Sequence, residues 1–237
     1  MRFGIWLLLA SFFLPRGFAA DPAVKIGAVP ASRILFLGNS ITKHGPAPQI
    51  GWEGDWGMAA SSADKDYVHL VTAAIERDAG ARPKILVKNI ADFERKHAGY
   101  DYAKELAAEL AFKPEIVFVA IGENVPEPKT DEAKQAYATA YAALLAELRK
   151  NSAPLIITRG SFWPNAVKDE LMRQASKDAG VTFVELNEIG RDAKNAASAE
   201  RDFKHAGVAG HPGDRGMQAI ADALVAALKS QSKTIGR

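Results

Sequence analysis

The 237-residue chain contains no cysteine. This absence excludes a disulfide-stapled scaffold, thiolate metal sites and a cysteine nucleophile. An excess of one charge is also missing, because 30 Lys and Arg residues face 28 Asp and Glu residues and the formal net charge is +2. A balance this close does not favour nucleic acid or a membrane surface as a partner. We therefore expect a protein that is stabilised by a full-sized hydrophobic core.

The chain also lacks a long hydrophobic run. Its most apolar run covers residues 5–14, whereas a membrane span needs roughly 20 residues. This run follows Met1-Arg2, and Gly17-Phe18-Ala19 places small residues at the −3 and −1 positions of a cleavage site. The pattern is typical of a signal peptide. We expect cleavage after residues 1–19, leaving residues 20–237 as one periplasmic or secreted domain without stable membrane association.

The rest of the chain alternates apolar runs with helical patterns. The predicted strands are residues 33–38, 84–90, 115–121, 154–159 and 181–186, and the predicted helices are residues 64–80, 100–112, 131–150, 165–180 and 215–229. The strands are continuously apolar, as strands covered on both faces should be. The alternation predicts an α/β fold with a parallel sheet and helices on both sides. Residues 21–32 are expected to be a polar lead-in and residues 230–237 a frayed tail.

A long loop interrupts this regular spacing between the first strand and the first helix. It is rich in turn-forming residues and carries Trp52 and Trp56. Loops of this length in compact domains are usually functional or disordered, and two tryptophans argue against disorder. We expect the loop to form a wall of a substrate site. The alternative is that both tryptophans only pack over the edge of a helix.

Polar residues stand where three of the predicted elements begin or end. Gly38-Asn39-Ser40 follows the first strand, Gly122-Glu123-Asn124 follows the third, and His211-Pro212 precedes the last helix. In open parallel sheets the binding crevice lies at the carboxyl ends of the strands, where the strand order reverses. A strand order of 2-1-3-4-5 would place Ser40 and Asn124 across that crevice. A serine, an amide and an imidazole are the groups that acyl transfer needs.

These three blocks resemble those of the SGNH (GDSL-type) hydrolase superfamily, in the same order. The resemblance extends from about Arg33 to Leu228 and implies a three-layer α/β/α fold with a flavodoxin-like, five-stranded parallel sheet of order 2-1-3-4-5. It also implies that Ser40 is the nucleophile, His211 the base and Asn124 an oxyanion donor. No cofactor is implied.

Two positions depart from the family pattern. Ala91 stands where the family has a glycine, and we retain its backbone N–H as an oxyanion candidate. Val208 stands three residues before His211, where the family usually has an aspartate. Three interpretations remain open: a backbone carbonyl orients the imidazole in a Ser-His dyad, another acid such as Asp202 or Asp214 substitutes, or activity has been lost.

Seven further residues are candidate substrate contacts, because the topology places them near the same edge of the sheet. They are Asn39, His44, Trp52, Trp56, Glu123, Arg159 and Trp163. An arginine there would suit an acidic sugar or a carboxylate, and a structural ion pair explains it equally well. Glu123 could contact a substrate hydroxyl or only cap its loop.

The combined features favour a serine esterase that removes acetyl or other small acyl groups from a carbohydrate. The expected partner is a small-molecule or glycan acyl ester and not nucleic acid. The alternative is an inactive or non-esterase carbohydrate-binding protein on the same scaffold, as the two departures suggest. A metal-dependent hydrolase using His44, His205 and His211 ranks last, because no pair of ligands has the spacing of a well-known zinc site. We therefore expect no metal.

Overall fold

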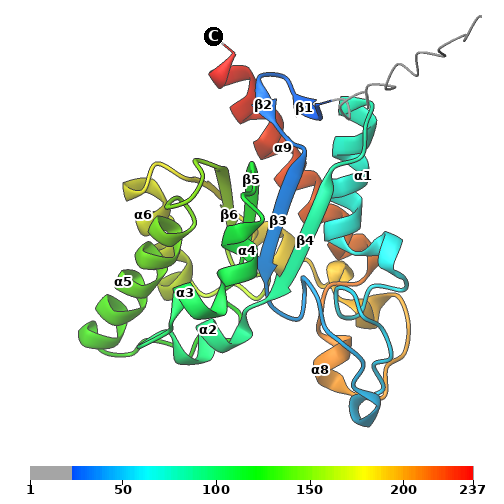
Figure 1. The fold of residues 1–237 in the computed structure, drawn as a ribbon. Coiled ribbons are helices and arrows are strands. Elements are labelled where there is room, and N and C mark those ends of the chain that lie inside the picture. The colour runs from blue at the N-terminus through cyan, green and yellow to red at the C-terminus, as the bar shows by residue number, and fades with distance from the viewer. Residues whose placement is uncertain (1–22, 237) are drawn as a thin grey trace, which may run out of the picture.

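A computed structural model describes residues 23–236 (Figure 1). The predicted signal peptide lies outside the described residues. None of the helices in the described part of the chain combines the length and the apolar character that crossing a membrane requires.

A five-stranded parallel sheet forms the centre of the fold. Its strands are β3 (Arg33–Gly38), β4 (Lys84–Asn89), β5 (Ile116–Ala120), β6 (Leu155–Arg159) and β7 (Thr182–Val184). They are ordered β4-β3-β5-β6-β7, and every neighbouring pair is parallel. The predicted fold class and the 2-1-3-4-5 order are confirmed. The order reverses beside β3, so the segments after β3 and β5 leave the sheet next to each other.

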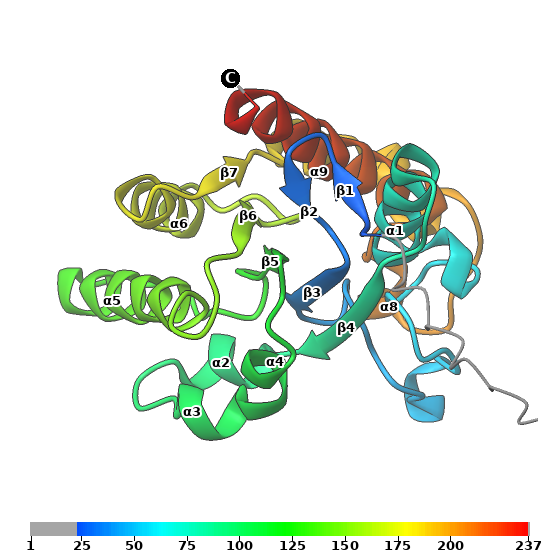
Figure 2. The same ribbon diagram turned by 45° about the horizontal axis from the view of Figure 1, so that its top comes forward.

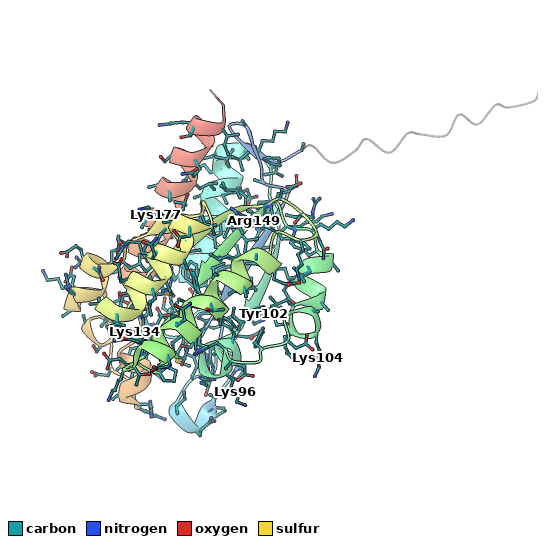
Figure 3. All side chains as sticks on the ribbon, turned by 90° about the vertical axis from the view of Figure 1, so that its left-hand side faces the viewer. Lys96, Tyr102, Lys104, Lys134, Arg149 and Lys177 are labelled. Carbon is teal, nitrogen blue, oxygen red and sulfur yellow. The ribbon has the colours of Figure 1, made fainter. Side chains whose placement is uncertain are left out.

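Two layers of helices cover the sheet. The longer helices are α1 (Tyr67–Ala79), α5 (Asp131–Glu147), α6 (Ala166–Asp178) and α9 (Asp214–Ile235), and the shorter ones are α2 (Ala91–Lys96), α3 (Tyr102–Glu105), α4 (Ala107–Ala111), α7 (Asn187–Arg191) and α8 (Ala206–Ala209). Helices α1 and α9 lie on one face, whereas α2 to α6 lie on the other (Figures 1 and 2). Figure 3 shows the outer side of the second layer, where Lys104 and Lys177 are exposed.

The side-chain alternation of β3 explains both layers. Ile34 and Phe36 belong to the hydrophobic core under α1 and α9. Leu35 and Leu37 belong to the core under α2 to α6. Successive side chains of a strand point to opposite faces. The alternate residues of a continuous apolar run are therefore buried on the two faces of the sheet.

The structure corrects two expectations about the ends of the domain. Residues 21–32 contain a small antiparallel hairpin of β1 (Lys25–Ile26) and β2 (Val29–Pro30), and α9 continues to Ile235 instead of fraying from residue 230. The two features lie against each other, because a Cβ atom added at Gly27 in the hairpin turn would be 3.3 Å from Ser232 Cβ of α9. The sequence pattern of so short a hairpin is too weak to predict this contact.

Gly38 ends β3 at a position where the backbone has no room for a side chain. A Cβ atom there would lie 1.7 Å from Thr42 Oγ1 and 2.9 Å from the Ala120 carbonyl oxygen. Thr42 cannot easily move away, because its buried hydroxyl lies 2.7 Å from the Tyr67 hydroxyl. The glycine therefore lets the chain turn tightly from the strand into Ser40.

We expect Gly38→Ala to lower the free energy of unfolding by about 3 kcal/mol, as overpacking of a filled core does. Urea denaturation monitored by circular dichroism measures the change. Gly45→Ala is the matched control, because the nearest atom to its added Cβ would be 3.9 Å away. Equal stability of the two variants would contradict the close-approach explanation.

Candidate active site

Ser40 and His211 are hydrogen-bonded to each other. Ser40 lies two residues after β3, and its Oγ is 2.8 Å from His211 Nε2. On the other side of the ring, His211 Nδ1 lies 2.6 Å from the Gly207 carbonyl oxygen. A carbonyl can only accept a hydrogen bond, so Nδ1 carries the proton and Nε2 offers its lone pair to the serine hydroxyl. The structure therefore contains the Ser-His dyad with a backbone carbonyl that the sequence left as one of three interpretations.

The surroundings of His211 favour the neutral imidazole. Burial lowers the pKa of His211 below its ordinary value, and the bond to the Gly207 carbonyl opposes this shift only in part. Burial disfavours the charged form of histidine because water no longer solvates it. The ring can thus act as a proton acceptor at neutral pH.

The carboxylate nearest in sequence to His211 has another role. Asp214 is the first residue of α9, and its carboxylate accepts hydrogen bonds from the backbone N–H and the hydroxyl of Ser61, at 2.7 and 2.6 Å. The N–H groups of Asp214 and Arg215 are bound by Glu200. Glu200 therefore caps α9 from another segment, and Asp214 is not the acid that orients His211.

Asn124 lies beside the dyad and presents a donor. The cavity at this edge of the sheet has a volume of about 290 Å³ and is lined by Ser40, Asn124 and His211 together with other residues. Asn124 Nδ2 donates one of its two hydrogens to Glu94 Oε2, at 2.7 Å. Its second hydrogen makes no bond within the described residues. Ser40, His211 and Asn124 therefore converge on one small volume.

Ala91 contributes to this cavity only as a wall. Its backbone N–H donates to Asn89 Oδ1 at 2.9 Å, and Asn89 Nδ2 donates in turn to the Lys43 carbonyl oxygen at 2.8 Å. The Ala91 N–H was expected to be an oxyanion donor. It is instead occupied by the side chain that holds the first turn of α2, so no free donor remains at that position.

A buried network of charges lies beneath the cavity. Arg159 is fully buried, and its Nη1 donates to Glu123 Oε1 at 2.6 Å. Asn39 Nδ2 donates to Glu123 Oε2 at 2.6 Å and to Glu94 Oε1 at 3.1 Å. One amide group thus joins two carboxylates. The Arg159 guanidinium helps hold the pKa of Glu123 below its usual range despite burial, whereas burial and the charge of Glu123 raise the pKa of Glu94.

The network overturns three expected substrate contacts. Asn39 and Arg159 are each 0% exposed, and the Glu123 side chain is 1% exposed. The sequence left open whether Arg159 binds an acidic ligand or forms a structural ion pair. The structure contains the ion pair, with Glu123. None of the three side chains lines the cavity, because each satisfies another buried polar group.

The tryptophans pack between the loop after Ser40 and the segment that carries His211. Trp52 Nε1 donates to the His44 carbonyl oxygen at 2.9 Å, and the buried Trp52 packs edge-on against Trp56. Trp52 shares a small apolar cluster with Val208, from the segment that carries His211. The long loop after Ser40 therefore packs against the histidine segment, and its tryptophans do not line the cavity.

His44 and Trp163 both lie close to the Ser40–His211 pair. His44 lines the cavity. The Trp163 ring is 40% exposed and stands edge-on to the His211 ring, with 5.0 Å between their centroids. Its Nε1 donates to the Gly210 carbonyl oxygen at 3.0 Å. Trp163 thus packs directly against the imidazole.

Sequence reasoning missed one wall of the cavity. Asn89, Asp92 and Arg95 line it from the end of β4 and from α2, and Met58 lines it from the loop after Ser40. The signal that could have found the first three is their place after the second strand, at the same sheet edge. The short helix α2 was hidden because six residues carry little periodicity. Among the described residues no group of three His, Asp or Glu side chains is placed to hold a metal ion.

Comparison with known proteins agrees with this geometry. The profile of the GDSL-like Lipase/Acylhydrolase family matches residues 36–219. No curated protein matches the chain in sequence. The lipase/acylhydrolase from Enterococcus faecalis is a similar solved structure, with 14% identity, a TM-score of 0.54 and coverage of 84% of this chain and 96% of that one.

Two carbohydrate esterases of known structure are also similar. An acetyl xylan esterase from the rumen bacterium Butyrivibrio proteoclasticus has 18% identity and a TM-score of 0.52, with coverage of 84% of this chain and 64% of that one. A family two carbohydrate esterase from Clostridium thermocellum, in complex with cellohexaose, has 18% identity and a TM-score of 0.52, with coverage of 90% and 66%. The chain thus spans less than two thirds of these two enzymes, and at such identities the likeness concerns the fold.

The buried network predicts that an asparagine at residue 39 gives a more stable protein than an aspartate does. Asn39→Asp would place a third carboxylate against Glu94 and Glu123, and we expect the free energy of unfolding to fall by about 3 kcal/mol at neutral pH. Thermal and urea unfolding measure this loss. Adding Glu94→Gln to Asn39→Asp should restore part of the stability, because it removes one of the repelling charges. An Asn39→Asp protein as stable as the wild type would contradict the assigned hydrogen bonds.

Proposed function

This chain belongs to the GDSL-like lipase/acylhydrolase family, and we propose that it is a serine esterase in which Ser40 is the nucleophile and His211 is the base. The observation that carries the proposal is the 2.8 Å contact between Ser40 Oγ and His211 Nε2, with Nδ1 held by a carbonyl. A serine hydroxyl is a weak nucleophile, and it needs a base within hydrogen-bond reach.

The first half-reaction transfers the acyl group to the enzyme. Ser40 Oγ attacks the ester carbonyl carbon while its proton moves to His211 Nε2. The carbonyl oxygen becomes an oxyanion, for which the second hydrogen of Asn124 Nδ2 and the Ser40 N–H are the proposed donors. When the carbonyl bond re-forms, the alcohol leaves and takes the proton from Nε2.

The second half-reaction returns the enzyme to its starting state. Water attacks the acyl-serine and gives one proton to His211 Nε2. The tetrahedral intermediate collapses, Ser40 Oγ leaves and recovers that proton, and a carboxylic acid is released. In both halves the Gly207 carbonyl dipole stabilises the transient imidazolium, as a carboxylate does in a full triad.

The shape of the site supports a small acyl group on a polar alcohol. The cavity is about 290 Å³, and Asn89, Asp92 and Arg95 supply polar groups beside the apolar Met58 and Ala91. We propose a carbohydrate ester, acetylated or with another small acyl group, as the substrate. The solved neighbours support this choice because they include an acetyl xylan esterase and a carbohydrate esterase in complex with cellohexaose. The signal-like N-terminus supports action in the periplasm or outside the cell.

We expect Ser40→Ala to lower kcat for p-nitrophenyl acetate and acetylated glycans by at least about 10³-fold, because the acyl-enzyme can no longer form. A serine-directed fluorophosphonate should label the wild type and not the variant. Equal turnover by the two proteins would remove Ser40 from the mechanism. Thermal protection by glycans, without turnover or labelling of the wild type, would instead favour the carbohydrate-binding alternative.

We expect kcat/KM to fall on the acid side with a midpoint below pH 6.5, the ordinary pKa of histidine. The reason is that the base must be neutral and burial lowers the pKa of His211. Its folded pKa is lower than its unfolded pKa, so protonation below pH 6.5 also destabilises the fold. Melting temperatures measured at each pH separate the loss of the neutral base from the loss of folded protein. A midpoint above 6.5 in a folded protein would contradict the assigned environment of His211.

A further inference from the structure

The carboxylate of Glu94 reaches from α2, beneath the cavity, to the loop after β5. Its Oε1 accepts hydrogen bonds from the backbone N–H groups of Gly122, at 2.6 Å, and Asn124, at 3.1 Å. Its Oε2 accepts Asn124 Nδ2 at 2.7 Å. The residue is fully buried. A single side chain thus binds both the backbone and the side chain of Asn124, which lines the cavity together with Ser40.

The next residue of α2 binds the other end of the same amide. Arg95 Nη2 donates to Asn124 Oδ1 at 3.3 Å. A carboxylate only accepts hydrogen bonds and a guanidinium only donates them. Glu94 therefore selects the nitrogen end of the Asn124 amide, and Arg95 selects the oxygen end.

This selection matters because an asparagine amide can rotate by half a turn at little steric cost. The two ends of the amide have nearly the same size, so hydrogen bonds decide which end faces which partner. An oxyanion is stabilised by a donor and repelled by the lone pairs of Oδ1. An amide held in one orientation also avoids reorganisation during the reaction.

We propose that Glu94 is a positioning residue of the esterase, and that together with Arg95 it holds the Asn124 amide with its nitrogen toward the oxyanion. The inference rests on the proposed function of Ser40. We define this pair of contacts as the amide clamp.

The remaining contacts keep the clamp rigid. Asn39 Nδ2 also donates to Glu94 Oε1, so four N–H donors point at this carboxylate. Such donors favour the ionised carboxylate and oppose the effect of burial. From α6, the buried Lys168 Nζ donates to the carbonyl oxygens of Gly122 and Val125, at 2.8 and 3.1 Å. The loop is therefore held by an anion on its N–H side and by a cation on its carbonyl side.

Glu94→Gln tests the clamp with almost no change in shape. The glutamine oxygen should take the Oε1 position, because two backbone N–H groups point there. Its NH₂ group would then face Asn124 Nδ2, donor against donor, and the Asn124 amide would turn its oxygen toward residue 94. We expect kcat for p-nitrophenyl acetate to fall about 100-fold, as for the loss of one oxyanion donor, with KM changing less than about threefold.

Glu109→Gln is the matched control. Glu109 is also a largely buried glutamate of the same layer, and it pairs with Lys88 away from the cavity. We expect this variant to keep the wild-type kcat. An equal fall of kcat in both variants would mean that a general loss of stability explains the effect, and it would overturn the proposal.

The Asn124→Ala background shows whether Glu94 acts through Asn124. There the amide is gone, and we expect Glu94→Gln to cause no further fall in kcat. If Glu94→Gln lowers kcat equally with and without Asn124, or leaves the wild-type kcat intact, the proposal is wrong. If Ser40→Ala is as active as the wild type, the esterase proposal itself fails. A Ser40-dependent enzyme that tolerates Glu94→Gln refutes only the clamp.

Arg95→Met keeps the proposal testable if Glu94→Gln does not fold. The Arg95 side chain is 54% exposed, so its loss leaves the core intact. We expect kcat to fall about threefold with Asn124 present and not at all in Asn124→Ala, as for loss of one weak hydrogen bond. An unchanged kcat in Arg95→Met would show that Arg95 does not orient the Asn124 amide. If Glu94→Gln also fails to fold, that result would overturn the proposal as a whole.

Discussion

The structure of the site depends on two buried carboxylates that share one amide group. Glu94 and Glu123 both accept hydrogen bonds from Asn39 Nδ2, and Arg159 neutralises Glu123. A buried charge is tolerated only where partners replace the water it has lost. The segments that follow β3, β4 and β5 are therefore tied to one another and to the end of β6 at one edge of the sheet. Ser40, the proposed nucleophile, immediately follows Asn39, so its position depends on this network.

The dyad shows how a histidine can be oriented without a carboxylate. The backbone carbonyl of Gly207 fixes the tautomer of His211, because it can only accept the proton on Nδ1. A carbonyl carries a dipole and no full charge, so it holds the ring in place but stabilises an imidazolium less than an aspartate would. Val208, in the position of the missing acid, instead packs in the apolar cluster that contains Trp52. The cluster joins the loop after Ser40 to the histidine segment.

Much of the fold could be predicted from the sequence because its signals are local. Continuous apolar runs identified all five strands of the parallel sheet, and the spacing of Ser40, Asn124 and His211 relative to those strands pointed to one edge. Short elements escaped because their stability comes from partners far away in the chain. The β1–β2 hairpin, helix α2 and the last turn of α9 are of this kind.

The roles of individual polar residues could not be predicted in the same way. Arg159, Glu123 and Asn39 stand where substrate contacts are expected, yet they bind one another and are buried. A sequence shows that a residue follows a strand, and it does not show whether the side chain turns into the cavity or beneath it. The sequence by itself determined the five strands and their alternation with helices, because hydrophobic periodicity is a local property, whereas the order of the strands was implied by the family resemblance. Only the tertiary structure decided which acceptor orients His211 and which side chains hold Asn124, because those hydrogen bonds join residues that only the folded chain brings together.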